Sequence, residues 1–249
     1  GKSPMTLFAG LGATSAVLML VFKDTILGLA AGVRLTSNDM LHKGDWITVK
    51  SVDANGIVED MSLTTVKVRN FDNTIVTISP ATLVNGSFQN WIGMQKSGGR
   101  RVKRIVYFDF RSIRLVDETL KQTLLAKHFA TEDSFKLKES LQKAIEKDIQ
   151  EGKDIEDLKN PAALAPTNLQ LYRRFMEKYL RQRPEVNTEL TLMVRHMEAT
   201  QCGLPIEFYF FIKDKVWVNY EHILADIMEH AYALANEFGL KIYEQYPEQ

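Results

Sequence analysis

The sequence predicts a chain of three parts: a membrane α-helix, a small antiparallel β-barrel and an α+β domain. Three observations predict this fold class. An uncharged apolar run extends from Met5 to Phe22, short alternating segments follow up to residue 95, and mixed strand and helix patterns fill the remainder. The expected domain boundaries are therefore residues 1–33, 34–96 and 97–249.

The composition is that of an ordinary globular protein apart from this apolar run. The chain has 249 residues, of which 45% are hydrophobic and 25% are charged. Its 31 basic and 31 acidic residues give a net charge of zero, which argues against a dedicated nucleic-acid binder. The single cysteine, Cys202, excludes an intrachain disulfide and favours a reducing compartment.

The uncharged run is long enough to approach the span of a bilayer. Met5–Phe22 extends about 27 Å at 1.5 Å per residue. A secretory signal peptide is disfavoured, because the run lacks a basic leading region and an Ala-x-Ala cleavage site. The sequence starts at Gly1 rather than at methionine, so further membrane helices are expected upstream.

Small residues recur at intervals of four along the apolar segment. Ala9 and Ala13 are one such pair, Gly12 and Ala16 are another, and Gly28–Gly32 forms a GxxxG sequence. This spacing lets helix backbones approach closely in lipid, although small residues are common in membrane helices in any case. The segment is therefore expected to pack against other helices.

The charged pair Lys23-Asp24 predicts a bend between two helices. The apolar run ends there and resumes as Thr25–Val33. Asp24 is the expected N-cap of the second helix, its carboxylate accepting backbone N–H groups from Ile26 or Leu27.

The region from residue 34 to residue 96 reads as short strands joined by turns. Trp46–Lys50 is a strand pattern, and Asn55-Gly56 is a hairpin signal. Thr64–Arg69 and Thr74–Ile78 both alternate between apolar and polar residues. Several short strands at this close spacing predict a small barrel of about five strands.

The last region has the strand and helix order of a ferredoxin-like α+β domain. Ser97–Gly99 marks its start, and a polar, proline-broken stretch at 151–166 is expected to be a loop or insertion. The expected strands are 101–110, 189–199, 205–213 and 240–243, and the expected helices are 117–128, 134–150, 168–183 and 220–238.

Catalytic and metal-binding motifs are weak in this sequence. It has no GxSxG, P-loop or HExxH pattern, so we expect neither an enzyme nor a cofactor. His222, Asp226 and His230 share one face of a predicted helix, a spacing that can hold zinc. A solvated polar face is the favoured interpretation, so no metal is expected.

Nucleic-acid binding by the barrel is the second alternative. Small barrels bind single strands through aromatic and basic residues, and the candidates here are Trp46, Lys50, Lys67, Arg69 and Phe71. Acidic residues are interspersed among them, so no basic stripe results. We therefore expect no nucleic-acid partner.

Three motifs carry a resemblance to a known family. Gly28–Val33, His42–Trp46 and Gly56–Glu59 resemble the small-conductance mechanosensitive channels, and residues 168–243 look like the larger miniconductance mechanosensitive channel. The resemblance implies a pore-lining helix, an Sm-like β-barrel and a cytoplasmic α/β domain enlarged by a helical insertion near 117–166. It also implies a homo-heptamer in the bacterial inner membrane, multi-pass in the full protein, with residues 34–249 in the cytoplasm.

The resemblance assigns roles along the first helix. Leu20 matches one of the family's two pore-constricting leucines and Ala16 falls at the other, while Lys23-Asp24 replaces a Gln-Gly pair at the family's bend. The remaining assignments are to helix packing (Ala9, Gly12, Ala13) and to a coupling half-helix (Gly28, Gly32).

The function implied is a channel opened by membrane tension that protects cells against hypo-osmotic shock. Its expected partners are the lipid bilayer, identical subunits and inorganic ions as permeants. A ring of apolar side chains at Leu20 would expel water and block ions until tension favours the wider state. The alternative is a membrane-anchored module whose barrel recruits a protein or RNA.

Overall fold

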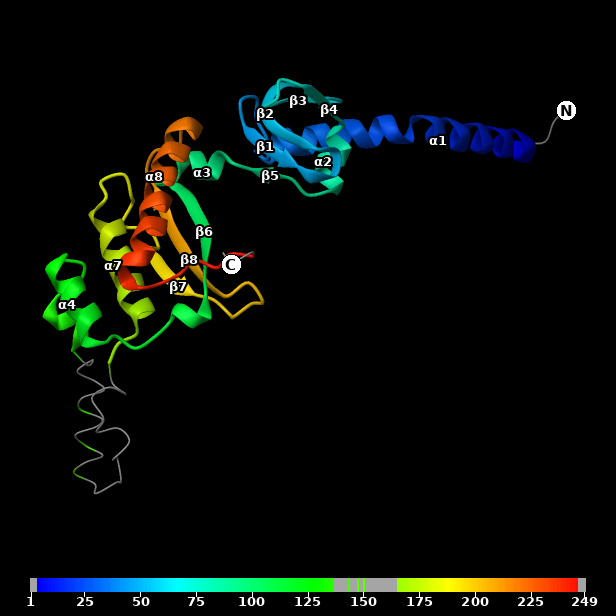
Figure 1. Ribbon diagram of the computed structural model, residues 1–249. Helices are drawn as coiled ribbons and strands as arrows, with labels where there is room; N and C mark the ends of the chain where they lie inside the picture. The colour runs from blue at the N-terminus through cyan, green and yellow to red at the C-terminus, as the bar shows by residue number, and fades with distance from the viewer. Residues whose placement is uncertain (1–3, 137–142, 144–146, 148–149, 151–164, 246–249) are drawn as a thin grey trace. The chain divides into compact units, whose positions relative to one another are not determined.

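The computed structural model describes residues 4–136, 143, 147, 150 and 165–245. The chain divides into two compact units, Gly1–Lys96 and Ser97–Gln249. In Figure 1 the first unit is coloured from blue to cyan-green, and the second from green to red. Each unit has its own hydrophobic core.

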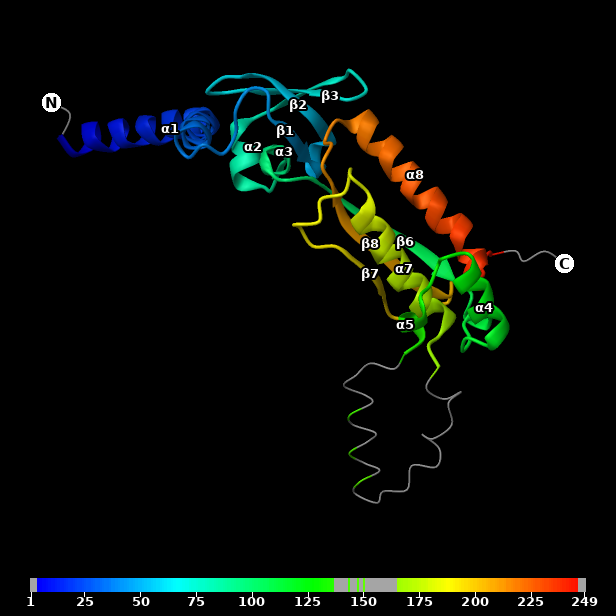
Figure 2. The same cartoon turned by 90° about the vertical axis from the view of Figure 1, so that its left-hand side faces the viewer.

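Helix α1 (Pro4–Ser37) is a single uninterrupted helix. The expected end and restart at Lys23-Asp24 are therefore wrong, because both residues lie inside α1 and Asp24 caps no helix. Lys and Asp cost at most about 0.7 kcal/mol each in a helix, and neither removes a backbone donor as proline does. Figure 2 shows the earlier part of α1 across the view and the later part almost end-on, so the helix bends without breaking. The position of the bend at 23–24 stays a prediction.

The first unit contains a five-stranded sheet in the order β4-β3-β2-β1-β5, with every neighbouring pair antiparallel. Its strands are β1 (Trp46–Val49), β2 (Ala54–Met61), β3 (Val66–Asn70), β4 (Ile75–Ile78) and β5 (Gln89–Asn90). The short helices are η1 (Lys50–Val52), α2 (Pro80–Asn85) and α3 (Ile92–Lys96). The expected number of strands is confirmed, and Sm-like barrel closure stays a prediction.

The core of the first unit forms between the sheet and two helices. Alternate residues of the strands point inward, among them Ile47 and Val68, which are fully buried. Leu83 comes from α2, and Leu35 comes from the last turns of α1. The C-terminal end of α1 is thus part of this core.

The second unit is built on a three-stranded antiparallel sheet in the order β6-β8-β7. Its strands are β6 (Arg100–Phe108), β7 (Met193–His196) and β8 (Leu204–Ile212). Its helices are η2 (Phe110–Ser112), α4 (Glu118–Ala126), α5 (Glu132–Phe135), α7 (Asn168–Gln182), α8 (Trp217–Ala235) and η4 (Asn236–Phe238).

Two expectations for this unit need correction, and others fall outside the described residues. The strand expected at 240–243 is only an isolated bridge between Phe108 and Ile242, and the strand expected at 189–199 is confined to β7. Most of the helix expected at 134–150, and of the loop or insertion at 151–166, lies outside the residues that the structure describes.

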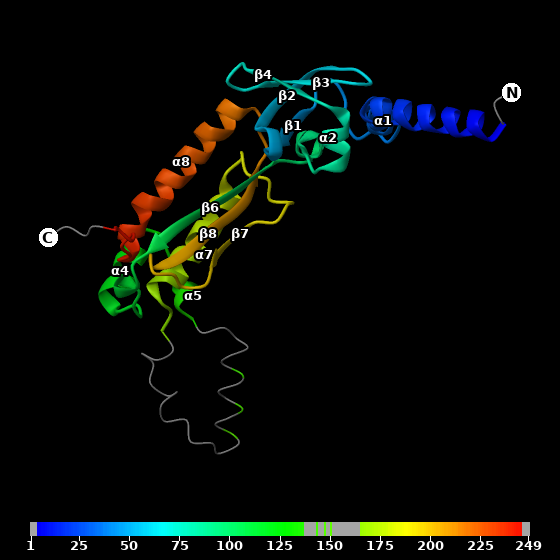
Figure 3. The same cartoon turned by 90° about the vertical axis from the view of Figure 1, so that its right-hand side faces the viewer.

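Helices α7 and α8 pack on the sheet (Figure 3), and the hydrophobic core of this unit includes several fully buried aromatic side chains. Phe108 and Phe208 contribute side chains to this core from the strands. The Tyr172 ring from α7 packs edge-on against the Phe108 ring, with the ring centroids 5.3 Å apart. The Tyr172 hydroxyl donates to the backbone oxygen of Ala231 in α8 at 2.6 Å, and burial raises the pKa of Tyr172. This hydrogen bond joins the two helices through the core.

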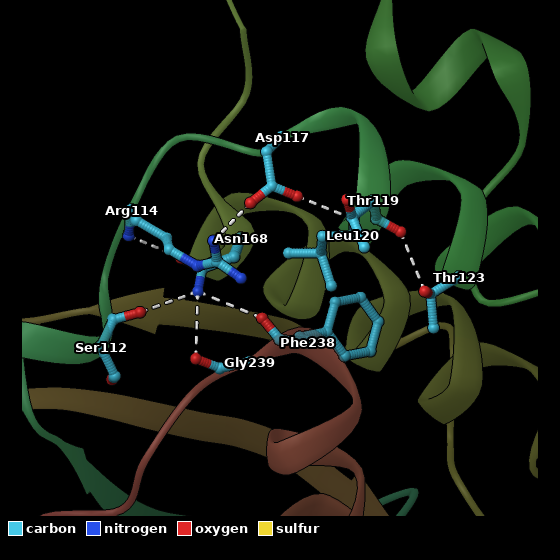
Figure 4. A network of polar contacts seen from close by, with 9 residues as sticks. All are labelled: Ser112, Arg114, Asp117, Thr119, Leu120, Thr123, Asn168, Phe238 and Gly239. Carbon is cyan, nitrogen blue, oxygen red and sulfur yellow. Dashed lines mark hydrogen bonds and ion pairs between the residues drawn. The ribbon is translucent and has the colours of Figure 1, made fainter.

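The side chain of Asn168, fully buried at the start of α7, joins three segments (Figure 4). Its Nδ2 donates to the backbone oxygens of Ser112 at 2.9 Å and Phe238 at 3.1 Å. Its Oδ1 accepts the backbone N–H of Arg114 at 3.0 Å and of Leu169 at 2.9 Å. One amide thus satisfies buried backbone groups from both ends of the second unit's sequence.

Candidate functional site

The candidate site is helix α1 together with its junction to the first sheet. The segment Phe8–Ser37 is long and apolar enough to cross a membrane, and little of it is buried within the chain. Its exposed large apolar residues are Phe8, Leu11, Val17, Leu18, Met19, Leu20, Val21, Phe22, Ile26, Leu27, Leu29 and Val33. They occur on every side of the helix, a distribution expected for a helix surrounded by lipid or other helices.

The residues assigned to packing and constriction lie along one face of α1. Ala9, Gly12, Ala16 and Leu20 are separated by three or four positions, and Ala13 lies beside Gly12 on the same face. Leu20 is 74% exposed within the chain. A Cβ at Gly12 would meet no atom within 4 Å. This face is therefore open to neighbours outside the chain.

The charged pair forms the next layer of the same face. Lys23 and Asp24 lie three and four residues after Leu20, so they come within one turn of it. Both are exposed in the chain. The structure therefore brings the candidate constriction and the charged pair together on one helix surface.

The two glycines assigned to coupling have different surroundings. A Cβ at Gly32 would lie 2.1 Å from the backbone oxygen of Leu63, in the turn between β2 and β3. A Cβ at Gly28 would meet nothing within 4 Å. Only Gly32 is therefore needed for the helix to approach the sheet, because any side chain there would collide with the turn.

The turn that touches Gly32 is held by its own hydrogen bonds. The Ser62 backbone N–H donates to the Thr65 oxygen at 2.8 Å, and the Ser62 hydroxyl accepts the Thr65 N–H at 3.1 Å. On the helix side, Ala31 and Leu35 are buried. The close contact at Gly32 thus joins a fixed turn to a buried helix end. Leu63 is absent from the sequence-based candidates, and its only signal is a leucine within a polar turn.

The connection from α1 to β1 is fixed by Asp45, which is 6% exposed. Its carboxylate accepts the backbone N–H of His42 at 3.1 Å and the side-chain amide of Asn90 at 2.7 Å. The same amide donates to the backbone oxygen of Met40 at 3.3 Å. Asp45 and Asn90 thus hold the loop after α1 against β5, a role that sequence reasoning did not assign to them.

Trp46 lies on the outer face of the sheet rather than in the core. Its ring stacks on that of Trp91 with the ring centroids 4.8 Å apart, and it makes an edge-to-face contact with Phe71 at a centroid distance of 5.3 Å. Its Nε1 donates to the Asn55 Oδ1 at 2.9 Å. These contacts fix the ring against its own sheet, and they favour a structural role for this aromatic group.

Two of the remaining sequence candidates, Arg69 and His230, have structural partners as well. Arg69, considered for nucleic-acid binding, forms an ion pair with Glu59 at 2.6 Å. His222 and Asp226 are exposed on α8, and the His230 ring stacks on Tyr179 at 5.7 Å. Within the described ranges, no group of three or more His, Cys, Asp or Glu side chains is arranged to hold a metal ion.

Residues 24–93 match a family model described as the β-domain of the mechanosensitive ion channels. The small-conductance mechanosensitive channel MscMJ of Methanocaldococcus jannaschii is 34% identical over 90 residues, which cover 36% of this chain and 25% of that protein. The large-conductance mechanosensitive channel MscMJLR of the same organism is 30% identical over 126 residues, covering 50% of this chain and 34% of the relative. The chain thus spans about a quarter to a third of these relatives.

Two solved structures share the fold over nearly the whole chain. The closed-state crystal structure of Helicobacter pylori MscS matches with a TM-score of 0.60 and 12% identity, covering 100% of this chain and 74% of that one. Arabidopsis thaliana MSL1 matches with a TM-score of 0.62 and 11% identity, covering 98% and 65%. The likeness to the miniconductance variant stays a prediction. Residues 24–93 of this chain are thus similar to the β-domain of mechanosensitive channels, and the fold of the chain is that of the MscS structures.

Proposed function

We propose that this chain is the pore and cytoplasmic part of a homo-oligomeric ion channel that opens under membrane tension. The observation that carries the proposal is the apolar helix α1, whose exposed face bears Leu20 and whose end is buried in a β-domain of the mechanosensitive family. Osmotic protection in a bacterial inner membrane is the corresponding cellular role. The channel passes inorganic ions and needs no catalytic group.

The proposed assembly is a ring of seven copies, by analogy with the family resemblance. The small residues Ala9, Gly12 and Ala13 supply close contacts between adjacent helices, because they let backbones approach in lipid. Leu20 and Ala16 line the neck, where apolar side chains expel water and stop ions. The first sheet is proposed to be Sm-like and the second unit ferredoxin-like, both on the cytoplasmic side.

Tension acts on this assembly as a ligand does on a two-state protein. The open state occupies more area in the bilayer, so tension stabilises it by its differential work on the two states. The contact between Gly32 and the Leu63 turn transmits helix movement to the sheet. The first unit then moves with the end of α1 rather than hanging from it as a passive domain.

Reconstitution of the full-length protein into liposomes tests the proposal. Suction applied to an excised patch should produce discrete current steps above a threshold, and protein-free patches should stay silent. Single-particle imaging of the same preparation counts the subunits. A purified, correctly inserted oligomer that stays silent up to patch rupture would overturn the channel assignment, and would favour the membrane-anchored binding module.

A further inference from the structure

The second unit contains a cavity of 390 Å³ between α7 and the segment that joins α4 to α5. Small-molecule sites have volumes of roughly 300–1,000 Å³, so this cavity is of a size that holds a compact ligand. Its wall on α7 includes Leu171, Phe175 and Lys178, which recur at helical spacing. The family resemblance assigns no role to this cavity.

The cavity carries positive charge. Arg174 and Lys178 stand four residues apart on the wall formed by α7, and both are exposed. The described lining residues include no carboxylate. Three acidic residues adjoin the lining residues in sequence, and each has a partner: Glu132 pairs with Lys121 at 3.9 Å, Asp133 pairs with Lys136 at 2.6 Å, and the Glu177 Oε1 accepts the Val194 backbone N–H at 2.9 Å. The charge of the cavity therefore suits an anion.

Aromatic rings line both walls of the cavity. His128 takes a positive φ of 58°, which turns the chain after α4 and directs Phe129 into the unit. Phe129 packs edge-on against Phe175 at 5.2 Å, and both line the cavity. Tyr179 extends this aromatic surface along α7. A planar group can therefore lie on one side of the cavity.

Two hydroxyl groups complete the polar side. The oxygens of Thr131 and Ser134 are 3.2 Å apart, and the Ser134 oxygen also accepts the Thr131 backbone N–H at 3.1 Å. One hydroxyl hydrogen is used within the pair, because only one of the two groups donates to the other. The second hydroxyl hydrogen is available to an acceptor such as a phosphate oxygen.

We propose that this cavity binds a small organic phosphate with a planar ring, of the size of a nucleoside monophosphate. Arg174 and Lys178 hold the phosphate by charge-assisted hydrogen bonds, which are stronger than neutral ones. The hydroxyl pair donates to the same group, and the ring lies against Phe129 and Phe175. Binding here does not depend on channel activity, so the failure of either proposal leaves the other standing.

Isothermal titration calorimetry on the full chain in detergent tests the site with adenosine 5′-monophosphate, adenosine and inorganic phosphate as separate probes. The monophosphate should bind once per chain, and each of the other two probes at least about tenfold more weakly. Arg174→Gln and Lys178→Gln should each weaken binding of the monophosphate about tenfold, the loss expected when a hydrogen bond to a charged group is removed.

Arg181→Gln is the matched control, because Arg181 is exposed on the same helix but does not line the cavity. It should leave the affinity unchanged, and thermal melts should show all three variants folded. An equal loss in Arg181→Gln, or no binding of the monophosphate, overturns the proposal. Binding of inorganic phosphate as tight as that of the monophosphate also overturns it, because the ring would then contribute nothing.

Discussion

The two glycines of α1 give a matched pair of substitutions with opposite expected effects. Gly32→Ala should destabilise the first unit, and Gly28→Ala should stabilise it. Both changes add one methyl group to the same helix, and both raise its intrinsic helix propensity. Only the surroundings differ, since a Cβ at position 32 meets the Leu63 backbone and one at position 28 meets nothing.

The expected magnitudes follow from the contact distances. Relieving a 2.1 Å approach at Gly32 requires a shift of about 1 Å, because real Cβ contacts essentially never fall below 3.0 Å. The Leu63 turn is held by hydrogen bonds, so the buried Ala31 and Leu35 must move instead. Overpacking of this kind costs about 1–3 kcal/mol. At both positions, alanine stabilises the helix by roughly 0.5–1 kcal/mol relative to glycine, and at Gly28 this gain is the whole expected effect.

Tryptophan fluorescence during thermal unfolding of the full chain in detergent measures both effects. Two of the three tryptophans, Trp46 and Trp91, belong to the first unit, so the signal reports mainly on that unit. For an overpacking cost of about 2 kcal/mol, the middle of that range, the net loss at Gly32 is about 1–1.5 kcal/mol. At about 4–8 °C per kcal/mol for a unit of this size, Gly32→Ala should lower Tm by roughly 4–12 °C and Gly28→Ala should raise it by roughly 2–8 °C. Equal shifts of the same sign in the two variants would refute the steric explanation.

Three further predictions address the neck, the second core and pH. Leu20→Ser should hydrate the proposed neck and therefore lower the membrane tension at which the channel opens in patch-clamp recordings. The control Leu18→Ser, on the opposite side of α1, should leave the opening tension unchanged. Unchanged opening tension in both variants would contradict the assignment of Leu20 to the neck. Asn168→Ala leaves several buried backbone groups unpaired, each at a cost of about 1–3 kcal/mol, so it should lower the Tm of the second unit by roughly 5 °C or more. The control Gln170→Ala should change this Tm little. Similar Tm values for the two variants would contradict the role given to Asn168. The Leu120 backbone N–H, aided by Arg114, holds the pKa of Asp117 below its ordinary value of 3.8. The carboxylate therefore stabilises α4 above that pH and loses its effect as pH falls through the lower folded-state pKa, so the stability deficit of Asp117→Ala should shrink in acid; a deficit independent of pH would count against the cap.

Local patterns in the sequence predicted most secondary structure correctly. The alternation of Thr64–Arg69 corresponds to β3, and α7 begins at the expected Asn168. The hairpin turn expected at Asn55-Gly56 was wrong, because both residues lie inside β2, and η1 with Asp53 makes the turn between β1 and β2. The expected helix end at Asp24 was wrong because capping ability shows only that a helix can start at a residue. Nothing at that position removes a backbone hydrogen bond, so the helix continues.

Contacts between distant residues account for what the sequence did not show. The approach of Leu63 to Gly32, and that of Asn90 to Asp45, join segments that are separate in sequence and come together only in the folded sheet. A GxxxG pattern gives equal weight to Gly28 and Gly32, although only one of them touches the sheet. The spacing of the glycines identifies the face of the helix that they share, but only the folded structure shows which glycine contacts the sheet.

The hydrogen bonds of Asn168 lie beside a second connection between the segments that precede α4 and α7. Leu115 bridges to Thr167, and the Val116 N–H donates to the Pro166 oxygen, so the segment before α4 and the segment before α7 are held together at one hydrogen-bonded clasp. Closing a loop costs only about 0.6 kcal/mol more for each doubling of its length. A change in the length of the chain between Val116 and Pro166 should therefore cost little and leave the start of α7 in place. The clasp makes this a place where insertions can be accommodated while the strands keep their register.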